Sequence, residues 1–262
     1  MELSTSTQAC LLLTTRLSAR DASEVLTAEQ FSLLREKLGE ENSISLLLEG
    51  NAEAVLCEYE ISAKFAKQIM QLLSRGVGLA IATEKWSRTG VWIVGCEDPE
   101  YPLSIQSCGT IPPVIFGYGS LELLDGGGVI VDESLETKFG PNDLATVIDG
   151  LKTSAIGILD LVRSREILVE LLQRGGQAVG ITYKDIVAYG SVEQLRRAVL
   201  GGRLVLVSSR PPGHQMKDKP IYEEAIKQAI GDPHVTRHAI QVLNEKESEG
   251  NDPPTQQLDL GF

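Results

Sequence analysis

Residues 175–209 read GGQAVGITYKDIVAYGSVEQLRRAVLGGRLVLVSS, and this stretch decides the fold class. A short apolar run at residues 178–181 is followed by an amphipathic segment at 191–200 and a second apolar run at 204–207. Nearly continuous apolar strands are typical of parallel sheets buried on both faces, and an amphipathic helix between two of them completes a βαβ unit. The stretch therefore predicts a strand, a helix and a parallel strand.

The same alternation begins at the triple glycine of residues 126–128. We expect two earlier strands, at residues 129–131 and 154–159. Amphipathic patterns predict helices at residues 142–151, 163–174 and 220–230. Residues 126–231 are thus predicted to form an α/β domain with a parallel sheet and flanking helices.

Two regions of different character precede this domain. Residues 1–90 are predicted to form a helical domain, in which Thr27 and Gln30 make a capping-box pattern and Ser62 opens a later helix. Residues 91–125 contain short β-type runs but also Asp-Pro and Pro-Pro elements. Because proline removes a backbone donor and restricts φ, we expect an extended connector there.

Residues 232–262 are predicted to form a helix and then a flexible tail. The stretch from Glu245 to Thr255 is charged, contains proline and has few apolar residues, as disordered segments do. His234 and His238 share one face of the expected helix, but two histidines without a third ligand do not predict a metal site.

Composition excludes several classes of function. The 262 residues carry a formal net charge of −12, which argues against broad electrostatic binding of duplex DNA but allows a small cationic pocket. No apolar run is long enough to span a bilayer, and the first residues lack a secretory signal. Four scattered cysteines fit reduced thiols. We therefore expect a cytoplasmic protein that binds no membrane, and no motif predicts a cofactor.

Several stretches resemble the bacterial DprA/Smf DNA-processing family over roughly residues 10 to 230. They are Glu84-Lys85-Trp86 with residues 90–93, Asp98-Pro99-x-Tyr101-Pro102, residues 112–119, residues 175–181 and residues 202–209. The resemblance implies a helical N-terminal domain followed by a Rossmann-like domain. It also implies a pocket for single-stranded DNA that three short motifs build on the Rossmann-like core.

The first two motifs of that pocket are altered in this chain. Where the family has Gly-Ser-Arg after the first strand, Val131 is followed by Asp132 and Glu133, whose charges repel phosphate. The second motif is reduced to Ser154, Gly157 and Asp160, without the glycine pair that lets backbone approach a ligand. We interpret this stretch as a plain buried strand.

The third motif keeps two cations. Lys217-Asp218-Lys219 stands where the family has Arg-Asn-Arg or Arg-Asn-Lys, with Arg210 and His214 nearby in sequence. These four basic residues, Arg210, His214, Lys217 and Lys219, are our candidate anion or DNA site. Lysine lacks the planar fork of arginine, so recognition is expected to be weaker. A solvated basic loop explains the pattern equally well.

The resemblance also implies another strand after residue 230, and the chain does not offer one. An uncovered sheet edge favours pairing with another chain. We therefore expect a protein partner, either an intact paralogous DprA-like chain or another product of the same operon.

The last residues, Gln257 to Phe262, resemble the peptide by which bacterial polymerases and repair factors bind the replication sliding clamp. Gln257 is suited to polar contacts at a pocket edge, and Leu258, Leu260 and Phe262 to apolar subpockets. The alternative is that the segment folds back onto an apolar groove of its own domain.

Together these features predict a non-catalytic accessory protein in DNA processing, transformation or recombination, or phage defence. It would act through protein partners and weak binding of single-stranded DNA. One alternative is a nucleotide-processing, phosphoribohydrolase-like enzyme that uses Arg163 with Glu166 or Arg165 with Glu170. Another is a purely structural adaptor. Charged pairs at such spacings usually only support a helix, so we predict no catalytic residues.

Overall fold

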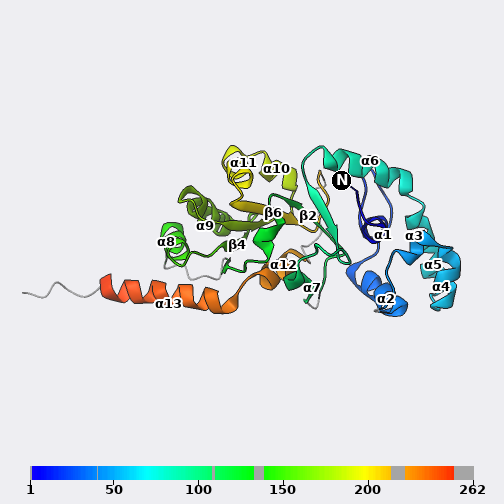
Figure 1. Cartoon of the computed structure of the whole chain (residues 1–262), viewed down its shortest axis with the longest axis horizontal. Coiled ribbons are helices and arrows are strands. Elements are labelled where there is room, and N and C mark those ends of the chain that lie inside the picture. Colours follow the sequence, from blue (N-terminus) through cyan, green and yellow to red (C-terminus); the bar gives the residue numbers. More distant parts are fainter. Residues whose placement is uncertain (1, 40, 108–109, 133–138, 214–221, 251–262) are drawn as a thin grey trace, which may run out of the picture.

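The computed structural model describes residues 2–39, 41–107, 110–132, 139–213 and 222–250. Within these residues a group of helices at the N-terminal end adjoins a sheet of six strands (Figure 1). The strand order is β1-β2-β6-β5-β4-β3. This mixed α/β, Rossmann-like architecture confirms the predicted fold class.

The N-terminal region is helical, as predicted. Its helices are α1 (Thr5–Thr14), α2 (Ala28–Leu38), α3 (Leu46–Glu49), α4 (Ala52–Glu58), α5 (Ala63–Leu73) and α6 (Gly76–Ser87). The capping box is present: the Gln30 amide donates to Thr27 Oγ1 at 3.3 Å, and the Thr27 amide donates to Gln30 Oε1 at 3.0 Å. Ser62 precedes α5, and Gly39 ends α2 with a φ of 82°.

Four parallel strands form the predicted core of the sheet. They are β3 (Val129–Val131), β4 (Ala155–Ile158), β5 (Ala178–Ile181) and β6 (Leu204–Ser208), paired in sequence order. The connecting helices are α8 (Pro141–Gly150), α9 (Val162–Gln173), α10 (Ile186–Gly190) and α11 (Glu193–Leu200). Right-handed crossovers that all advance in one direction place their helices on one face of a sheet. Helices α9 and α11 lie above the strands in Figure 1, and α8 packs against α9. Helix α12 (Tyr222–Ile230) covers the opposite face.

Residues 91–125 are more than the extended connector that we expected. They contain β1 (Trp92–Gly95), α7 (Leu103–Gln106), β2 (Val114–Tyr118) and the 3-10 turn η1 (Leu121–Leu124). Strand β2 pairs antiparallel with β6, and β1 pairs antiparallel with β2. The prolines lie between the strands, where no ladder hydrogen bond is required of them, so they do not prevent pairing. The domain boundaries proposed from the sequence stay predictions.

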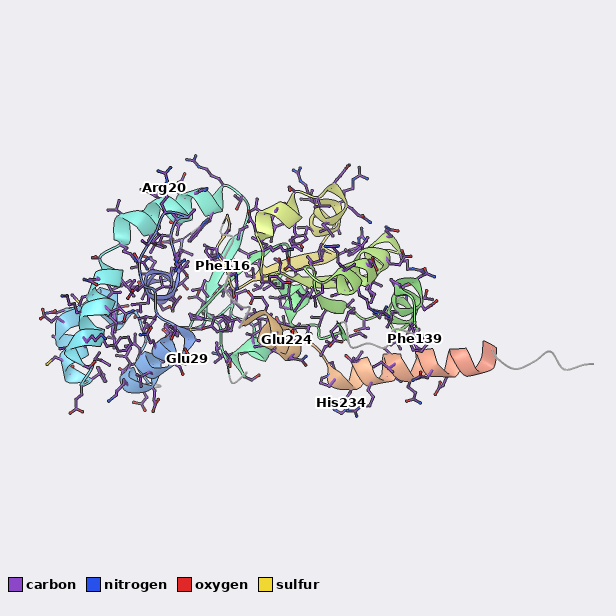
Figure 2. All side chains as sticks on the ribbon, turned by 180° about the vertical axis from the view of Figure 1, so that it is seen from behind. Arg20, Glu29, Phe116, Phe139, Glu224 and His234 are labelled. Carbon is purple, nitrogen blue, oxygen red and sulfur yellow. The ribbon has the colours of Figure 1, made fainter. Side chains whose placement is uncertain are left out.

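Strand β2 also joins the helical region to the sheet. Phe116, fully buried in β2, lies in the middle of the molecule (Figure 2). Its ring meets that of Trp86 of α6 edge to face, with the ring centroids 5.5 Å apart. The Trp86 side chain belongs to one of the stretches that resemble DprA/Smf, and the structure shows that it is a core contact between the two regions.

The C-terminal part differs from expectation at the β3 edge. No further strand follows α12 in the part of the chain that the structure describes; helix α13 (Pro233–Gly250) packs against β3 and α8 instead. The Asp232 amide donates to Gly128 O, and the outward amide of Ile130 donates to Thr236 Oγ1, each at 2.9 Å. The chain therefore closes its own edge at Ile130, which removes the reason for expecting a partner strand there.

Helix α13 extends past the sheet, away from the N-terminal helices (Figure 1). The flexible tail was expected to begin at Glu245, but the helix continues to Gly250, so that prediction is wrong for residues 245–250. None of the helices that the structure describes is both long and apolar enough to cross a bilayer.

Candidate functional site

The carboxyl ends of five strands meet at one edge of the sheet. Two successive antiparallel pairings make β1 run in the same direction as β6, and β3 to β6 are parallel. This carboxyl edge is where open α/β sheets bind ligands. The residues at or just beyond these strand ends are Cys96, Asp132, Asp160, Thr182 and Ser209.

At the end of β3, Asp132 faces a cation from α12. Lys227 is only 2% exposed, and its Nζ lies 3.6 Å from Asp132 Oδ2 and 2.6 Å from Glu224 Oε1. Buried charges are retained where they are paired. One lysine thus lies close to two carboxylates, Asp132 and Glu224.

At the end of β4, Asp160 is committed to internal hydrogen bonds. Its side chain is fully buried and accepts from Thr182 Oγ1 at 2.8 Å, from the Tyr183 amide at 2.9 Å and from Tyr189 Oη at 2.9 Å. Lys184 Nζ lies 3.4 Å from Asp160 Oδ1. Burial, and then the Asp160 charge, raise the pKa of Tyr189 to about 12, so this tyrosine stays a hydrogen-bond donor.

The residues that correspond to the second motif of the resemblance are packed inside the protein. A Cβ atom on Gly157 would lie 2.1 Å from Ser164 Oγ, and this hydroxyl donates to Val131 O at 3.2 Å. Ser154 Oγ donates to Gly127 O at 2.5 Å. The space beside Gly157 is therefore filled by the first turns of α9, as the interpretation of a plain buried strand requires.

At the end of β6, Arg210 is buried rather than displayed. Its side chain is 9% exposed, with Nε 3.8 Å from Glu223 Oε1, and Glu223 Oε1 also accepts from Ser209 Oγ at 2.7 Å. Arg210 is thus a poor candidate for a solvent-facing anion site. The other members predicted for that site, His214, Lys217 and Lys219, lie outside the described residues, as do the candidate clamp residues Gln257, Leu258, Leu260 and Phe262.

The residues of the enzyme alternative make structural contacts. Arg163 Nη2 donates to Phe139 O at 2.5 Å, and Arg165 Nη1 donates to Leu159 O at 3.5 Å. Glu170 Oε1 pairs with Arg174 Nε at 3.2 Å, one helical turn away. The two arginines thus connect α9 to residues outside the helix, and the Glu170–Arg174 pair supports the C-terminal end of the helix itself.

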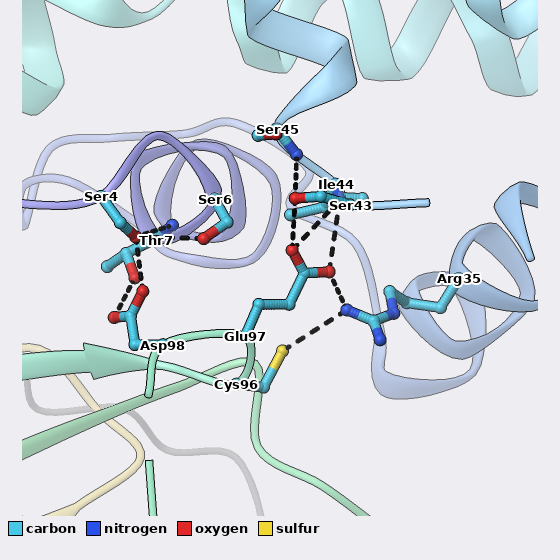
Figure 3. Close-up of polar contacts among 10 residues, drawn as sticks. All are labelled: Ser4, Ser6, Thr7, Arg35, Ser43, Ile44, Ser45, Cys96, Glu97 and Asp98. Carbon is cyan, nitrogen blue, oxygen red and sulfur yellow. Dashed lines mark hydrogen bonds and ion pairs between the residues drawn. The ribbon is translucent and has the colours of Figure 1, made fainter. Parts of the chain in front are cut away.

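At the end of β1, two carboxylates connect the sheet to the N-terminal helices (Figure 3). Glu97 accepts from Arg35 Nη1 and, at 2.6 Å, from Ser43 Oγ. Asp98 accepts from the hydroxyls of Ser4 and Thr7 and, at 2.8 Å, from the Gly95 amide. We call Cys96, Glu97 and Asp98 the junction. Sequence reasoning found Asp98 only as part of a resemblance and missed Glu97, although two acidic residues directly after an apolar strand were the available signal.

The fold and this edge define a class: a helical N-terminal region on a Rossmann-like sheet whose ligand edge is acidic and internally paired. Among solved structures, the chain is similar to DNA processing protein A (DprA) from Streptococcus pneumoniae. The TM-score is 0.61 at 16% sequence identity, covering 99% of this chain and 89% of that one. The chain therefore has the fold of DprA. No family model matches the sequence, and no curated protein matches it.

Proposed function

We propose that the protein is a non-catalytic accessory factor in DNA processing that works through protein contacts. Contact with single-stranded DNA is, in this proposal, confined to the segment that holds Lys217 and Lys219. The fold likeness to DprA supports the general role. The ion pairs between cations and carboxylates at the carboxyl edge support the proposal that DNA contact elsewhere on the sheet is weak.

That pairing leaves little attraction for phosphate. The charged groups concerned are Lys184, Arg210 and Lys227, which face Asp160, Glu223, and Asp132 with Glu224, respectively. Phosphate binding requires amides or cations that are not already matched to carboxylates. Each of these three cations already lies within 3.8 Å of a carboxylate, which supports weak attraction for phosphate at this edge.

Fluorescence anisotropy with a labelled oligothymidylate tests the DNA part of the proposal. We expect weak binding at low salt that disappears at moderate salt, because few phosphates are contacted. The double variant Lys217→Glu, Lys219→Glu should abolish it, whereas Lys152→Glu, an exposed control two residues after the end of α8, should not. Tight binding that survives the double variant would contradict the proposal. Release of free base from nucleoside monophosphates would favour the enzyme alternative, and complete absence of DNA binding the pure adaptor.

We further propose that the replication sliding clamp is one partner, bound by Gln257, Leu258, Leu260 and Phe262. The support is the sequence pattern, together with the course of α13, which ends at Gly250 away from the sheet (Figure 1). Titration of the full chain against purified clamp should give saturable binding. Leu258→Ala with Phe262→Ala should remove it and Asp259→Ala should retain it, because Asp259 is expected to face solvent. No saturation at high micromolar concentration would reject the clamp.

Affinity purification from the native host tests the remaining partner prediction. A paralogous DprA-like chain or another operon product should be retained together with the tagged protein. Since α13 closes the β3 edge at Ile130, we expect such a partner to bind elsewhere on the chain. Loss of the partner on Thr236→Val alone would contradict this placement.

A further inference from the structure

A small pocket lies between the helical region and the sheet. Its walls come from the turn between α6 and β1, from the end of β2, from α10, which packs against β2, and from α11 (Figure 1). Its volume is about 230 Å³, and the lining residues are Thr89, Val91, Tyr118, Val187, Gly190, Ser191 and Arg196. Ligand pockets occur preferentially where two parts of a protein meet. None of these residues belongs to the carboxyl edge, so the pocket is a separate location.

The aromatic wall of this pocket is held in place by two glycines. The ring of Tyr118, which is half-buried, lies between Gly90 and Gly190. A Cβ atom on Gly90 would lie 3.3 Å from Tyr118 Cε2, and one on Gly190 would lie 3.1 Å from Cδ1 and Cε1. Both edges of the ring are therefore closely packed. Val91 and Val187 add apolar surface beside it, so the pocket offers a rigid, mostly apolar wall to a flat ligand.

Arg196 supplies a positive charge to the pocket. The structure shows no ion pair or side-chain hydrogen bond between Arg196 and any residue that it describes. The next residue, Arg197, is different because its guanidinium pairs with Glu193 one helical turn away. The charge of Arg196 is thus free to pair with an anionic group of a ligand.

The other polar groups and the volume narrow the choice of ligand. Thr89 Oγ1 donates to Trp86 O at 2.6 Å and Ser191 Oγ donates to Ala188 O at 2.7 Å, so both hydroxyl protons are already used. The guanidinium of Arg196 is then the charged donor, and its planar fork matches a carboxylate. A phosphate group, with a charge of about −1.5 to −2, would be only partly neutralised. Ligand pockets usually measure about 300–1,000 Å³, so this smaller one has room for about one ring.

We propose that this pocket binds a small aromatic carboxylate, a single flat ring that carries one carboxylate group. The ring packs against Tyr118 and the apolar side chains of Val91 and Val187. The carboxylate accepts a pair of hydrogen bonds from Arg196. Because the walls come from both regions of the chain, the bound ligand stabilises the contact between the helical region and the sheet.

Fluorine NMR with 4-fluorobenzoate tests the pocket in the full chain. We expect the ligand signal to shift and broaden with saturation as protein is added, and benzoate to displace the probe. Benzamide, which has the same shape without the charge, should compete about tenfold more weakly, because a charged pair becomes a neutral hydrogen bond. Displacement by inorganic phosphate as effective as that by benzoate would indicate an unspecific anion site and overturn the proposal. Tighter binding of N-acetylphenylalanine than of benzoate would also overturn it, by assigning the pocket to a partner's peptide.

Two neighbouring arginines give a matched pair of variants. Arg196→Gln should weaken binding of 4-fluorobenzoate by about tenfold, whereas Arg197→Gln, one residue further along α11, should leave it unchanged. Gly190→Ala should also weaken binding, because the added Cβ meets the ring of Tyr118 at 3.1 Å. Benzoate should raise the melting temperature of the wild type and of Arg197→Gln but not that of Arg196→Gln. Arg196 is exposed, so the variants should melt alike without ligand. Equal affinity of the wild type and Arg196→Gln would overturn the proposal.

Discussion

The two edge strands of the sheet, β1 and β3, meet different neighbours. At β1, the junction carboxylates Glu97 and Asp98 bind helices that come from the start of the chain, more than fifty residues away. At β3, the cap is supplied by Asp232 and Thr236, which follow shortly after α12 in the chain. The β1 edge is closed by two acidic side chains and by close packing on Gly95, and the β3 edge by one backbone amide, one hydroxyl and the helix that carries the hydroxyl.

This difference indicates how each edge responds to change. Hydrogen bonds to charged groups contribute more than neutral ones, and a close backbone approach tolerates no added atom. A neutral cap on an exposed helix contributes less and is replaced more easily by water. We therefore expect the β1 edge to be the more sensitive one.

Gly95→Ala should have the largest effect. The added Cβ meets Thr7 Oγ1 at 2.2 Å and Thr7 Cα at 3.1 Å, so α1 must move away from β1. Overpacking of this kind costs about 3 kcal/mol of unfolding free energy, measured by urea denaturation. Gly150→Ala is the matched control because nothing lies within 4 Å of its Cβ; there we expect no loss and a gain of up to about 1 kcal/mol.

Asp98→Ala should come next. It removes the acceptor for the Gly95 amide and for the hydroxyls of Ser4 and Thr7. Leaving these donors without their charged partner costs about 2 kcal/mol in the same measurement. Exposed Asp125→Ala should change stability by no more than about 0.5 kcal/mol. Equal effects of the two variants would show that the junction does not stabilise the β1 edge.

Thr236→Val tests the β3 edge with a change of nearly equal volume. The Ile130 amide loses its acceptor, and we expect a loss of about 1 kcal/mol. Amide hydrogen exchange at Ile130 should accelerate, because the opened edge admits water. Thr146→Val on α8 provides the control, since its hydroxyl bonds only within its own helix. If Ile130 exchanges at the wild-type rate, Thr236 does not cap the edge.

An effect of similar size concerns Asp21, which pairs with Arg75, the residue that donates to the carbonyl oxygens of Leu12 and Thr15 at the end of α1. Burial alone would raise its pKa, but hydrogen bonds from Ser23 and Leu17 and the charge of Arg75 outweigh this and lower it to about 2. A folded pKa below the unfolded one, about 3.9, stabilises the protein above that value and loses its effect as the pH falls through about 2. Asp21→Asn should cost about 1 kcal/mol at pH 7, and the difference should shrink below pH 4. A difference that is independent of pH would contradict the pKa.

Much of the core was predictable from local pattern. The strands at 178–181 and 204–207 and the helix that precedes the second are where periodicity placed them. So is the capping box at Thr27, because its chemistry involves residues only three apart. The prolines led to the wrong prediction for residues 91–125, since a proline count does not reveal that the residues on either side of them, in β1 and β2, pair with each other and that β2 pairs with β6.

The candidate site was predictable only in part. The resemblance predicted that Asp132 stands in place of a phosphate-binding motif and that Asp160 is a remnant of another. It did not predict that Lys227 pairs with Asp132 or that Tyr189 donates to Asp160. Arg210 was selected for its charge, yet it is buried against Glu223, thirteen residues further along the chain. Which group pairs with a charged side chain depends on how whole helices pack. The type of a residue does not predict this packing.

The order of apolar and polar residues was enough to establish an α/β chain with a helical N-terminal region, because hydrophobic periodicity follows directly from backbone geometry. The closing of each of the two sheet edges was decided by tertiary structure alone. Each joins groups tens of residues apart or more, and only the assembled sheet brings them within hydrogen-bonding distance.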